Sequence, residues 1–280
     1  MLFLLLAPSG KLSSYRRYNT PRLQAMRVQL LRHATLLVQL AGSDYLIDPM
    51  LSPAEAWEPV RNSANPRRNP LVELPLSAAE LDKVLESVAA IFVTHTHGDH
   101  WDKPAQERLP KDRPIFCQPN DAEAIRGEGF RQVMPVNPRL EWEGLEIALT
   151  GGRHGTGEVA ERIGPVSGFV LRAENEPSLY VAGDTIWCEQ VEVALEAHQP
   201  SVVVVNAGAA QFTDSGPITM DAGDVLSVAR AAPDSRVVAV HFESINHCVL
   251  SRRELRERVE REGLAERVLI PSDGEVLEYA

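Results

Sequence analysis

Cysteine is scarce in this sequence, with only three among 280 residues, at Cys117, Cys188 and Cys248. None of them belongs to a Cys-x-x-Cys pair, and the odd count does not suit a disulfide framework. The pattern therefore argues against a cysteine-based zinc site and against a small disulfide-stabilised fold. Free thiols are typical of a reducing compartment, so we predict a cytoplasmic protein.

Positive charge is also in short supply: 28 Lys and Arg face 39 Asp and Glu, which gives a net charge of −11. Nucleic-acid-binding proteins usually carry a basic surface, because contacts to phosphates supply much of their affinity. The composition thus predicts no nucleic-acid partner. Long apolar runs are missing too, since the opening Met-Leu-Phe-Leu-Leu-Leu is far shorter than the roughly 20 residues of a membrane span. We predict no membrane span.

The pattern of apolar residues predicts one α/β domain over residues 26–280, preceded by a tail at 1–25. Met26 is an alternative start of the native protein, because regular alternation begins just after it. In the second half, predicted helices at 189–198, 222–231 and 252–262 precede predicted strands at 201–205, 236–241 and 267–270. Earlier, strands are predicted at 27–32, 35–40, 45–47, 89–93, 114–117, 145–149, 167–171 and 179–181, and helices at 76–85, 104–109 and 121–126.

The strongest signal for chemistry is Thr-His-Thr-His-Gly-Asp-His at 94–100, directly after a predicted strand. Side chains two positions apart on an extended segment point the same way, so His95 and His97 can bind one ion. The glycine that follows lets the backbone turn, which can direct Asp99 and His100 to a second ion. Imidazole and carboxylate together suit zinc, manganese or iron. The alternative is an exposed histidine-rich loop without a metal.

Further residues can complete such a site. A carboxylate or imidazole at the end of a strand, beside glycine, is well placed to present a ligand at the edge of a sheet. Taken singly, each has a simpler explanation as a surface or packed polar residue. The candidates are His33 between the first two strands, His154 in a glycine-rich turn, Asp184 in Ala-Gly-Asp-Thr, His241 at a strand end, and His247 shortly after it.

In kind and order, His95-x-His97-x-Asp99-His100 and the later His154, Asp184 and His241 resemble the metal-binding residues of the metallo-β-lactamase fold superfamily. The resemblance covers about residues 26–280 and implies a four-layer αββα sandwich of two mixed sheets with helices outside. Within the superfamily, the opening Arg-His-Ala-Thr-Leu-Leu-Val and the later Leu-Ile-Asp-Pro are similar to the ascorbate-6-phosphate lactonase-like branch. The phospholipase D that cleaves N-acyl-phosphatidylethanolamines has a similar opening.

The resemblance also implies a role for each residue and a cofactor of two divalent ions, zinc first and manganese or iron as alternatives. Asp184 would bridge the two ions. Asp48 and His33 would support the ligands from outside, while Asp99 and His247 would act in catalysis. The implied ligands are His95, His97 and His154 for one ion and Asp99, His100 and His241 for the other.

The activity implied is hydrolysis of a small ester-like molecule by a hydroxide that the two ions share, with a lactone first and a phosphodiester second. An iron-dependent oxygenase or oxidoreductase on the same fold is one alternative. A metal-binding protein without turnover is another. The sequence leaves the natural substrate, the native metal and homo-oligomerisation open.

A long stretch at 51–75, rich in proline, asparagine and arginine, is predicted to be a functional loop. It contains Arg61, Arg67 and Arg68, and arginine side chains match the geometry of phosphate and carboxylate groups. We therefore predict that Arg67 and Arg68 select an anionic small-molecule substrate and that Trp187 forms a wall of its pocket. The alternatives are a solvated loop and a tryptophan packed in the core.

Overall fold

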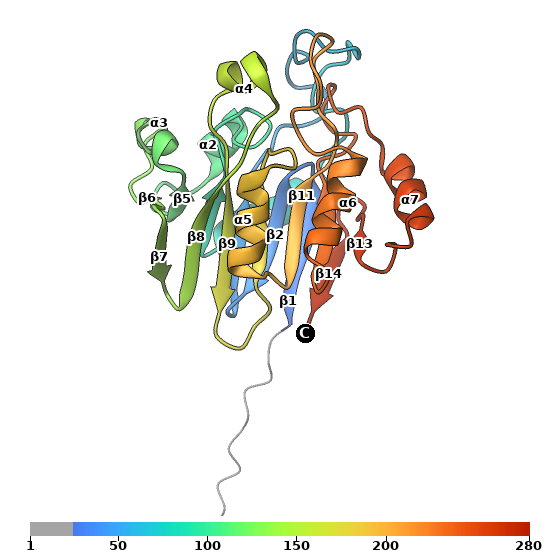
Figure 1. The fold of residues 1–280 in the computed structure, drawn as a ribbon. Helices are drawn as coiled ribbons and strands as arrows, with labels where there is room; N and C mark the ends of the chain where they lie inside the picture. Colours follow the sequence, from blue (N-terminus) through green and yellow to red (C-terminus); the bar gives the residue numbers. More distant parts are fainter. Residues whose placement is uncertain (1–24) are drawn as a thin grey trace, which may run out of the picture.

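Two seven-stranded sheets lie face to face, with helices on both outer faces (Figure 1). The computed structural model describes residues 25–280, so the predicted tail falls outside the described residues except at its last position. Four layers in the order helix, sheet, sheet, helix confirm the αββα sandwich that the resemblance implied. No helix of residues 25–280 is long and apolar enough to cross a membrane.

The first sheet joins an antiparallel meander from the N-terminus to a set of parallel strands. Its strands are β1 (Met26–Arg32), β2 (Thr35–Leu40), β3 (Ser43–Ile47), β4 (Ala90–Val93), β5 (Ile115–Cys117), β6 (Val133–Pro135) and β14 (Val276–Tyr279). They lie in the order β14-β1-β2-β3-β4-β5-β6, antiparallel from β14 to β3 and parallel from β3 to β6. The helices over its outer face are α1 (Ala78–Ser87), α2 (Lys103–Arg108) and α3 (Ala122–Gly127), the last preceded by the short η1 (Pro119–Asp121).

The second sheet repeats this plan with the second half of the chain. Its strands are β7 (Arg139–Trp142), β8 (Leu145–Gly151), β9 (Ser167–Ala173), β10 (Leu179–Val181), β11 (Val202–Asn206), β12 (Arg236–Val240) and β13 (Val268–Leu269). They lie in the order β13-β12-β11-β10-β9-β8-β7, antiparallel from β7 to β10 and parallel from β10 to β13. The helices are α4 (Gly157–Ile163), α5 (Glu189–His198), α6 (Ala222–Ala231) and α7 (Arg252–Arg261).

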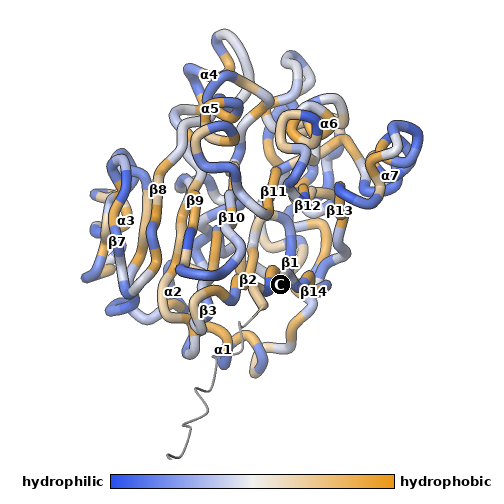
Figure 2. Tube along the Cα trace, turned by 60° about the horizontal axis from the view of Figure 1, so that its bottom comes forward, coloured by the Kyte–Doolittle hydropathy of each residue, from blue (hydrophilic) through white to orange (hydrophobic). Residues whose placement is uncertain are grey.

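Three apolar clusters hold the layers together. One lies between the sheets and joins residues such as Phe92 and Val204 from opposite strands. A second packs the other sheet against α5, α6 and α7, and a third packs the first sheet against α1, α2 and α3. Figure 2 shows the matching pattern, with apolar stretches along the strands and a polar α7 at the periphery. The sandwich therefore buries both faces of each sheet over much of its area, as hydrophobic burial favours.

Most predicted elements are present, and the errors have local causes. The predicted helices at 189–198 and 222–231 match α5 and α6, and the capping box of Ser77 and Glu80 begins α1. The strand predicted at 45–47 is longer than expected, because β3 already begins at Ser43. Sequence analysis missed β6, β7, α4 and β14, which are short elements that bury little.

The long loop at 51–75 is anchored to both sheets rather than loosely attached. The buried guanidinium of Arg32 donates hydrogen bonds to the carbonyl oxygens of Val72, Met50 and Ser52 at 2.8–2.9 Å. Burial lowers the pKa of Arg32 to about 10, and nearby carboxylates, first that of Asp102, oppose this effect. In Figure 1 this loop, α4 and the loop before α6 lie at the end of the sandwich opposite the C-terminus.

Candidate metal centre

The histidine motif leaves the end of β4, whose four residues are all buried. The chain then turns, with the backbone N–H of His100 bonded to the carbonyl of His97 at 2.9 Å. Asp184 follows β10 after Gly183, which has a φ of +70° and where a Cβ would lie 2.3 Å from the carbonyl oxygen of Ser167. This close approach of backbone requires glycine and fixes the start of the Asp184 turn.

The remaining histidines also lie just beyond strand ends. His154 follows β8, and His241 follows β12 with a φ of +72°. His33, at a φ of +61°, turns the chain between β1 and β2, and its carbonyl accepts the backbone N–H of His241 at 2.9 Å. Positive φ is uncommon for non-glycine residues and recurs at functional sites, where the surroundings hold the strain.

The structure brings the implied ligands into three overlapping groups that can hold a metal ion. Within each group, the ligand atoms lie within 4.8 Å of one another. The groups are His95, His97 and His154; His95, His100 and Asp184; and His33, Asp99, His100 and His241. His33 thus lies closer to the ligand atoms than the sequence suggested, since the resemblance gave it only a supporting place.

Asp184 lies between the first and last of these groups. Its Oδ2 is 4.0 Å from His95 Nε2 and 3.6 Å from His154 Nε2. Its Oδ1 is 3.3 Å from Nε2 of both His100 and His241. Each carboxylate oxygen therefore faces a different set of imidazoles. The amide of Asn206, at the end of β11, donates to Oδ1 at 2.7 Å and fixes this orientation.

The donor set fits a metal, because the inward nitrogen of several buried imidazoles has no hydrogen-bond partner. Such orphaned nitrogens are Nε2 of His95, His100 and His241. A buried polar atom without a partner costs free energy unless something else binds it. Metal ligation through these nitrogens removes that cost, and together with the carboxylates it gives the nitrogen and oxygen ligands that zinc, manganese and iron accept.

The outward nitrogens, by contrast, are held. His97 Nε2 donates to the carbonyl of Ile163 at 3.2 Å, and His154 Nδ1 donates to the carbonyl of Ile218 at 2.7 Å. His97 is therefore left with Nδ1 for a metal, whereas His154 is left with Nε2. Such outer contacts fix the tautomer and the ring orientation of metal-binding histidines.

Asp48 supports two further histidines. Its Oδ2 accepts from His100 Nδ1 at 2.9 Å and from the Thr94 hydroxyl at 2.7 Å, while Oδ1 accepts from the Thr94 amide at 2.7 Å. The Thr94 hydroxyl in turn lies 3.0 Å from His95 Nδ1. A single buried carboxylate thus orients one imidazole from each half of the cluster. The resemblance implied a supporting role for Asp48, and these contacts are the basis on which we retain that prediction.

His241 has a different outer partner, the thiol of Cys248, whose Sγ lies 3.5 Å from Nδ1. Burial raises the pKa of Cys248, against the effect of His241, so the sulfur is held as a neutral thiol. Sequence analysis missed this contact. The only local signal was the position of Cys248 directly after His247, which does not predict a contact with His241.

The carboxylates and imidazoles of the cluster shift one another's pKa values. Burial would raise the pKa of Asp184, but His241 and His100 lower it well below its ordinary value. Burial would lower the pKa of His100, but Asp184, Asp99 and Asp48 raise it well above the ordinary value. Burial lowers the pKa of His95, and His100 and His97 lower it further. Without cations, the carboxylates are therefore ionised and protons occupy part of the imidazole set.

His247 lies at the edge of the cluster with a 7% exposed side chain. Burial lowers its pKa to about 4, and its Nδ1 has no hydrogen-bond partner. Its ring lies beside Phe212, with centroids 6.2 Å apart and planes 23° apart.

The neighbouring Asn246 is buried and connects this segment to the long loop. It bonds to Val60 and Asn69 of the loop at 2.7–2.9 Å. Nothing in the sequence indicated this role.

The residues predicted to contact substrate have other partners in this structure, and their role stays a prediction. Arg68 bonds to Glu58 and to the carbonyl of Glu55 within its own loop, and Arg67 lies 3.8 Å from the Glu55 carboxylate. Arg61 lines a shallow pocket formed by the loop itself. Trp187 packs against the apolar cluster beneath α5 and α6, which is the packed alternative.

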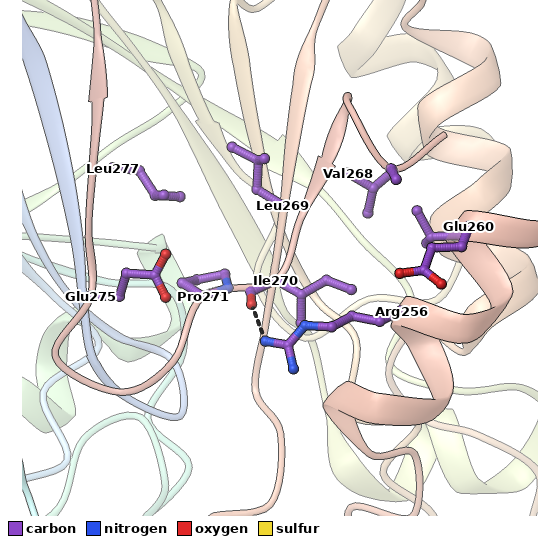
Figure 3. Close-up of a pocket in the computed structure, with 10 residues that line it drawn as sticks. Arg256, Glu260, Val268, Leu269, Ile270, Pro271, Glu275 and Leu277 are labelled. Carbon is purple, nitrogen blue, oxygen red and sulfur yellow. Dashed lines mark hydrogen bonds between the residues drawn. The ribbon is translucent and has the colours of Figure 1, made fainter. Parts of the chain in front are cut away.

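A separate pocket of about 250 Å³ opens between α7, β13 and β14 (Figure 3). Its lining is largely aliphatic, and Arg256 closes one side by donating to the carbonyl of Ile270 at 2.7 Å. None of the clustered histidines or carboxylates lines it. This pocket is therefore separate from the histidine cluster.

Comparison with known proteins agrees with the geometry. Residues 44–242 match the model of the Beta-lactamase superfamily domain. The UPF0173 protein YddR of Bacillus subtilis is 38% identical over 256 residues, covering 89% of this chain and 98% of that protein. A UPF0173 metal-dependent hydrolase of Methanopyrus kandleri is 28% identical, covering 90% of this chain and 100% of that protein.

Two solved structures are also similar. The isothiocyanate hydrolase from Delia radicum gut bacteria superposes with a TM-score of 0.85 at 39% identity, covering 90% of this chain and 98% of that one. A possible metal-dependent hydrolase from Veillonella parvula gives a TM-score of 0.86 at 35% identity, covering 91% and 99% of the two chains.

Proposed function

This chain belongs to the UPF0173 family of metal-dependent hydrolases within the β-lactamase superfamily, and we propose that it binds two divalent cations, zinc first, and hydrolyses a small electrophilic substrate. The observation that carries the proposal is the placement of Asp184, whose two oxygens face two different imidazole sets. One set would be His95, His97 and His154, and the other Asp99, His100 and His241, with Asp184 shared.

The chain's own residues would hold and orient the reacting groups. His33 Nε2 donates to Asp99 Oδ2 at 3.1 Å, and this bond keeps that oxygen close to His241 Nε2, at 3.6 Å. The Asp99 side chain is 14% exposed, so it faces the mouth of the site and can accept a proton there. When bound, divalent cations supply a water whose pKa falls to about 7.

His247 is best placed to contact the substrate as a neutral imidazole. It is buried beside the ligands, and its pKa of about 4 leaves it uncharged at neutral pH. Its unpartnered Nδ1 can donate to or accept from a polar substrate atom. We place it in that role rather than as a proton donor.

We rank substrates with a reactive carbon, isothiocyanates and lactones, before phosphodiesters. Similarity to the isothiocyanate hydrolase supports the first class, because the two chains are 39% identical over nearly their full lengths. The second class, lactones, is supported by the resemblance of the opening strands to the ascorbate-6-phosphate lactonase-like branch. That narrower placement stays a prediction.

The test combines metal analysis with a substrate panel. Gently purified protein should contain close to two equivalents of zinc, manganese or iron in sum. Removing the metals with a chelator should abolish turnover. Adding metal back, directly or by dialysis against zinc, should restore it. The panel contains phenyl isothiocyanate, a γ-lactone and bis(4-nitrophenyl) phosphate. One iron per chain with oxygen uptake would support an oxygenase instead, and no turnover of any class would support a metal-binding protein without catalysis.

A further inference from the structure

We propose that Arg162 and Phe212 form a recognition subsite that binds the anionic end of a substrate whose reacting end lies at the histidine cluster. The subsite deepens the proposed function and rests on it, because it takes the cluster as the place where the reacting end binds. It moves anion recognition from the long loop to α4. The chemical class that fits is a flat apolar group carrying a carboxylate or a similar anion.

Phe212 contacts His247 at the edge of the histidine cluster. It belongs to the loop between β11 and α6 and is half-buried. Its ring lies beside that of His247, which is close enough to Asp99, His241 and Asp184 to feel their charges. The buried Nδ1 of His247 has no partner and marks this side of the cluster as built to receive a polar group. A flat substrate group passing His247 would meet the Phe212 ring.

Arg162 lies over the ring of Phe212. Its guanidinium carbon is 5.5 Å from the ring centroid, within the range of a cation–π contact. The next residue, Ile163, accepts the hydrogen bond from His97 Nε2, so the end of α4 sits directly against the cluster. The Arg162 side chain is exposed, and its one contact among residues 25–280 is the one with Phe212. Contact with the ring leaves the N–H edge of the guanidinium available for an anion.

The arginines of the long loop differ from Arg162 because carboxylates lie beside them. Arg67 and Arg68 face the carboxylates of Glu55 and Glu58, so their charges are already balanced within the loop. Arg162 keeps its charge in a chain whose net charge is −11. An anionic substrate drawn to the cluster would therefore find an unbalanced guanidinium at α4 and not at the loop.

Helix α4 can also adapt to the substrate. It buries none of its residues and has no side-chain cap at its N-terminus. Glycines at positive φ stand at its two ends, Gly157 at +60° as its first residue and Gly164 at +96° directly after it, and a Cβ at either position would meet open space. The position of Arg162 can thus adjust without disturbing a packed core.

Binding of unreactive dicarboxylates tests the subsite without requiring turnover. Benzoate offers one carboxylate for the metals, whereas terephthalate and isophthalate offer a second for Arg162. Calorimetry on the zinc-loaded protein should give a dissociation constant for the better dicarboxylate about three- to tenfold below that for benzoate, the lower part of the range for a charge-assisted bond because Arg162 is exposed. Arg162→Ala should remove this difference.

Two further variants complete the experiment. Arg162→Lys should retain part of the difference, and Arg67→Ala, an exposed arginine of the loop, should retain all of it. The subsite is refuted if neither dicarboxylate binds better than benzoate in the wild type, or if the preference survives in Arg162→Ala. A preference that depends on Arg162, together with failure of the whole substrate panel, would refute the proposed hydrolysis and leave the subsite standing.

Discussion

Replacing Asp48 by asparagine is the sharpest test of how the cluster is held. The substitution keeps the shape of the side chain but exchanges one acceptor oxygen for an amide donor. The remaining oxygen can still accept from the Thr94 amide, where the carboxylate now accepts at 2.7 Å. The new NH₂ group would then face His100 Nδ1, which at present donates to Asp48 Oδ2 at 2.9 Å.

Two donors cannot share that contact, so the His100 proton must move to Nε2. The protonated Nε2 loses the lone pair that would bind the cation. Loss of an outer partner of this kind typically weakens metal binding by about 10–100-fold. We expect the upper half of that range, since the Thr94 hydroxyl that faces His95 also loses its acceptor, Asp48 Oδ2. A 100-fold loss corresponds to about 2.7 kcal/mol.

Competition with a chromophoric chelator measures the effect for each equivalent of zinc or cobalt. Asp102→Asn is the matched control, because this buried carboxylate accepts from the Ser52 amide and hydroxyl at 2.6 and 2.7 Å and contacts none of the histidines. Both variants should lose stability in the metal-free form, but only Asp48→Asn should lose metal affinity. Unchanged affinity in Asp48→Asn, or equal loss in the two variants, would refute the tautomer argument.

Three other predictions concern the same cluster. Metal uptake should release protons and strengthen as pH rises, because the cations displace protons from His241. Burial lowers the pKa of His241, but Asp184 and Cys248 raise it to about 10. Calorimetry in two buffers of different ionisation enthalpy measures the proton release, and uptake without it would contradict the prediction. Asp184→Ala should lose bound metal and nearly all activity, whereas His247→Ala should keep both equivalents, as elemental analysis can decide. Gly208→Ala should destabilise the fold by about 3 kcal/mol or more, because its Cβ would lie 2.1 Å from the carbonyl oxygen of His241, while Gly98→Ala, with nothing within 4 Å, should be close to neutral in thermal unfolding.

The N-terminal tail gives a separate prediction for the whole chain. A chain that starts at Met26 should fold and keep its metals, since β1 begins at that residue and pairs with β14 through Met26 and Tyr279. Solubility and metal content of the shortened protein measure this. Insoluble or metal-free protein would show that the first residues contribute to the fold.

The resemblance implied the sandwich, and the sequence pattern predicted most of its elements because their signals are local. Helices α5 and α6 have clear apolar faces and defined ends, and the histidine motif directly follows a fully buried strand. The elements that sequence analysis missed bury little: β7 alternates exposed and half-buried residues at the edge of its sheet, and α4 buries none. Hydrophobic periodicity has nothing to detect in such segments.

In the candidate site, too, some residues could be predicted from the sequence and others could not. The implied ligands were readable from their kinds and order, because each stands at a strand end. Their outer partners were not, since Cys248 reaches His241 only through a turn and Asn246 bonds to residues 177–186 positions away. Contacts of that range leave no pattern in a single sequence. Arg67 and Arg68 are a different case, because their acidic neighbours Glu55 and Glu58 lie within the same loop.

The anchoring of the long loop bears on how the site would select its substrate. Arg32, on β1, donates to the loop carbonyls of Ser52 and Val72 and to that of Met50 just before the loop. Asn246 bonds to Val60 and Asn69 from the segment that carries His247. Buried hydrogen bonds of this kind fix a segment against the fold, because breaking them would leave polar groups unpaired. The loop is therefore fixed against the segment that carries His247. Adjustment to different substrates then falls to α4, which buries no side chain and carries Arg162.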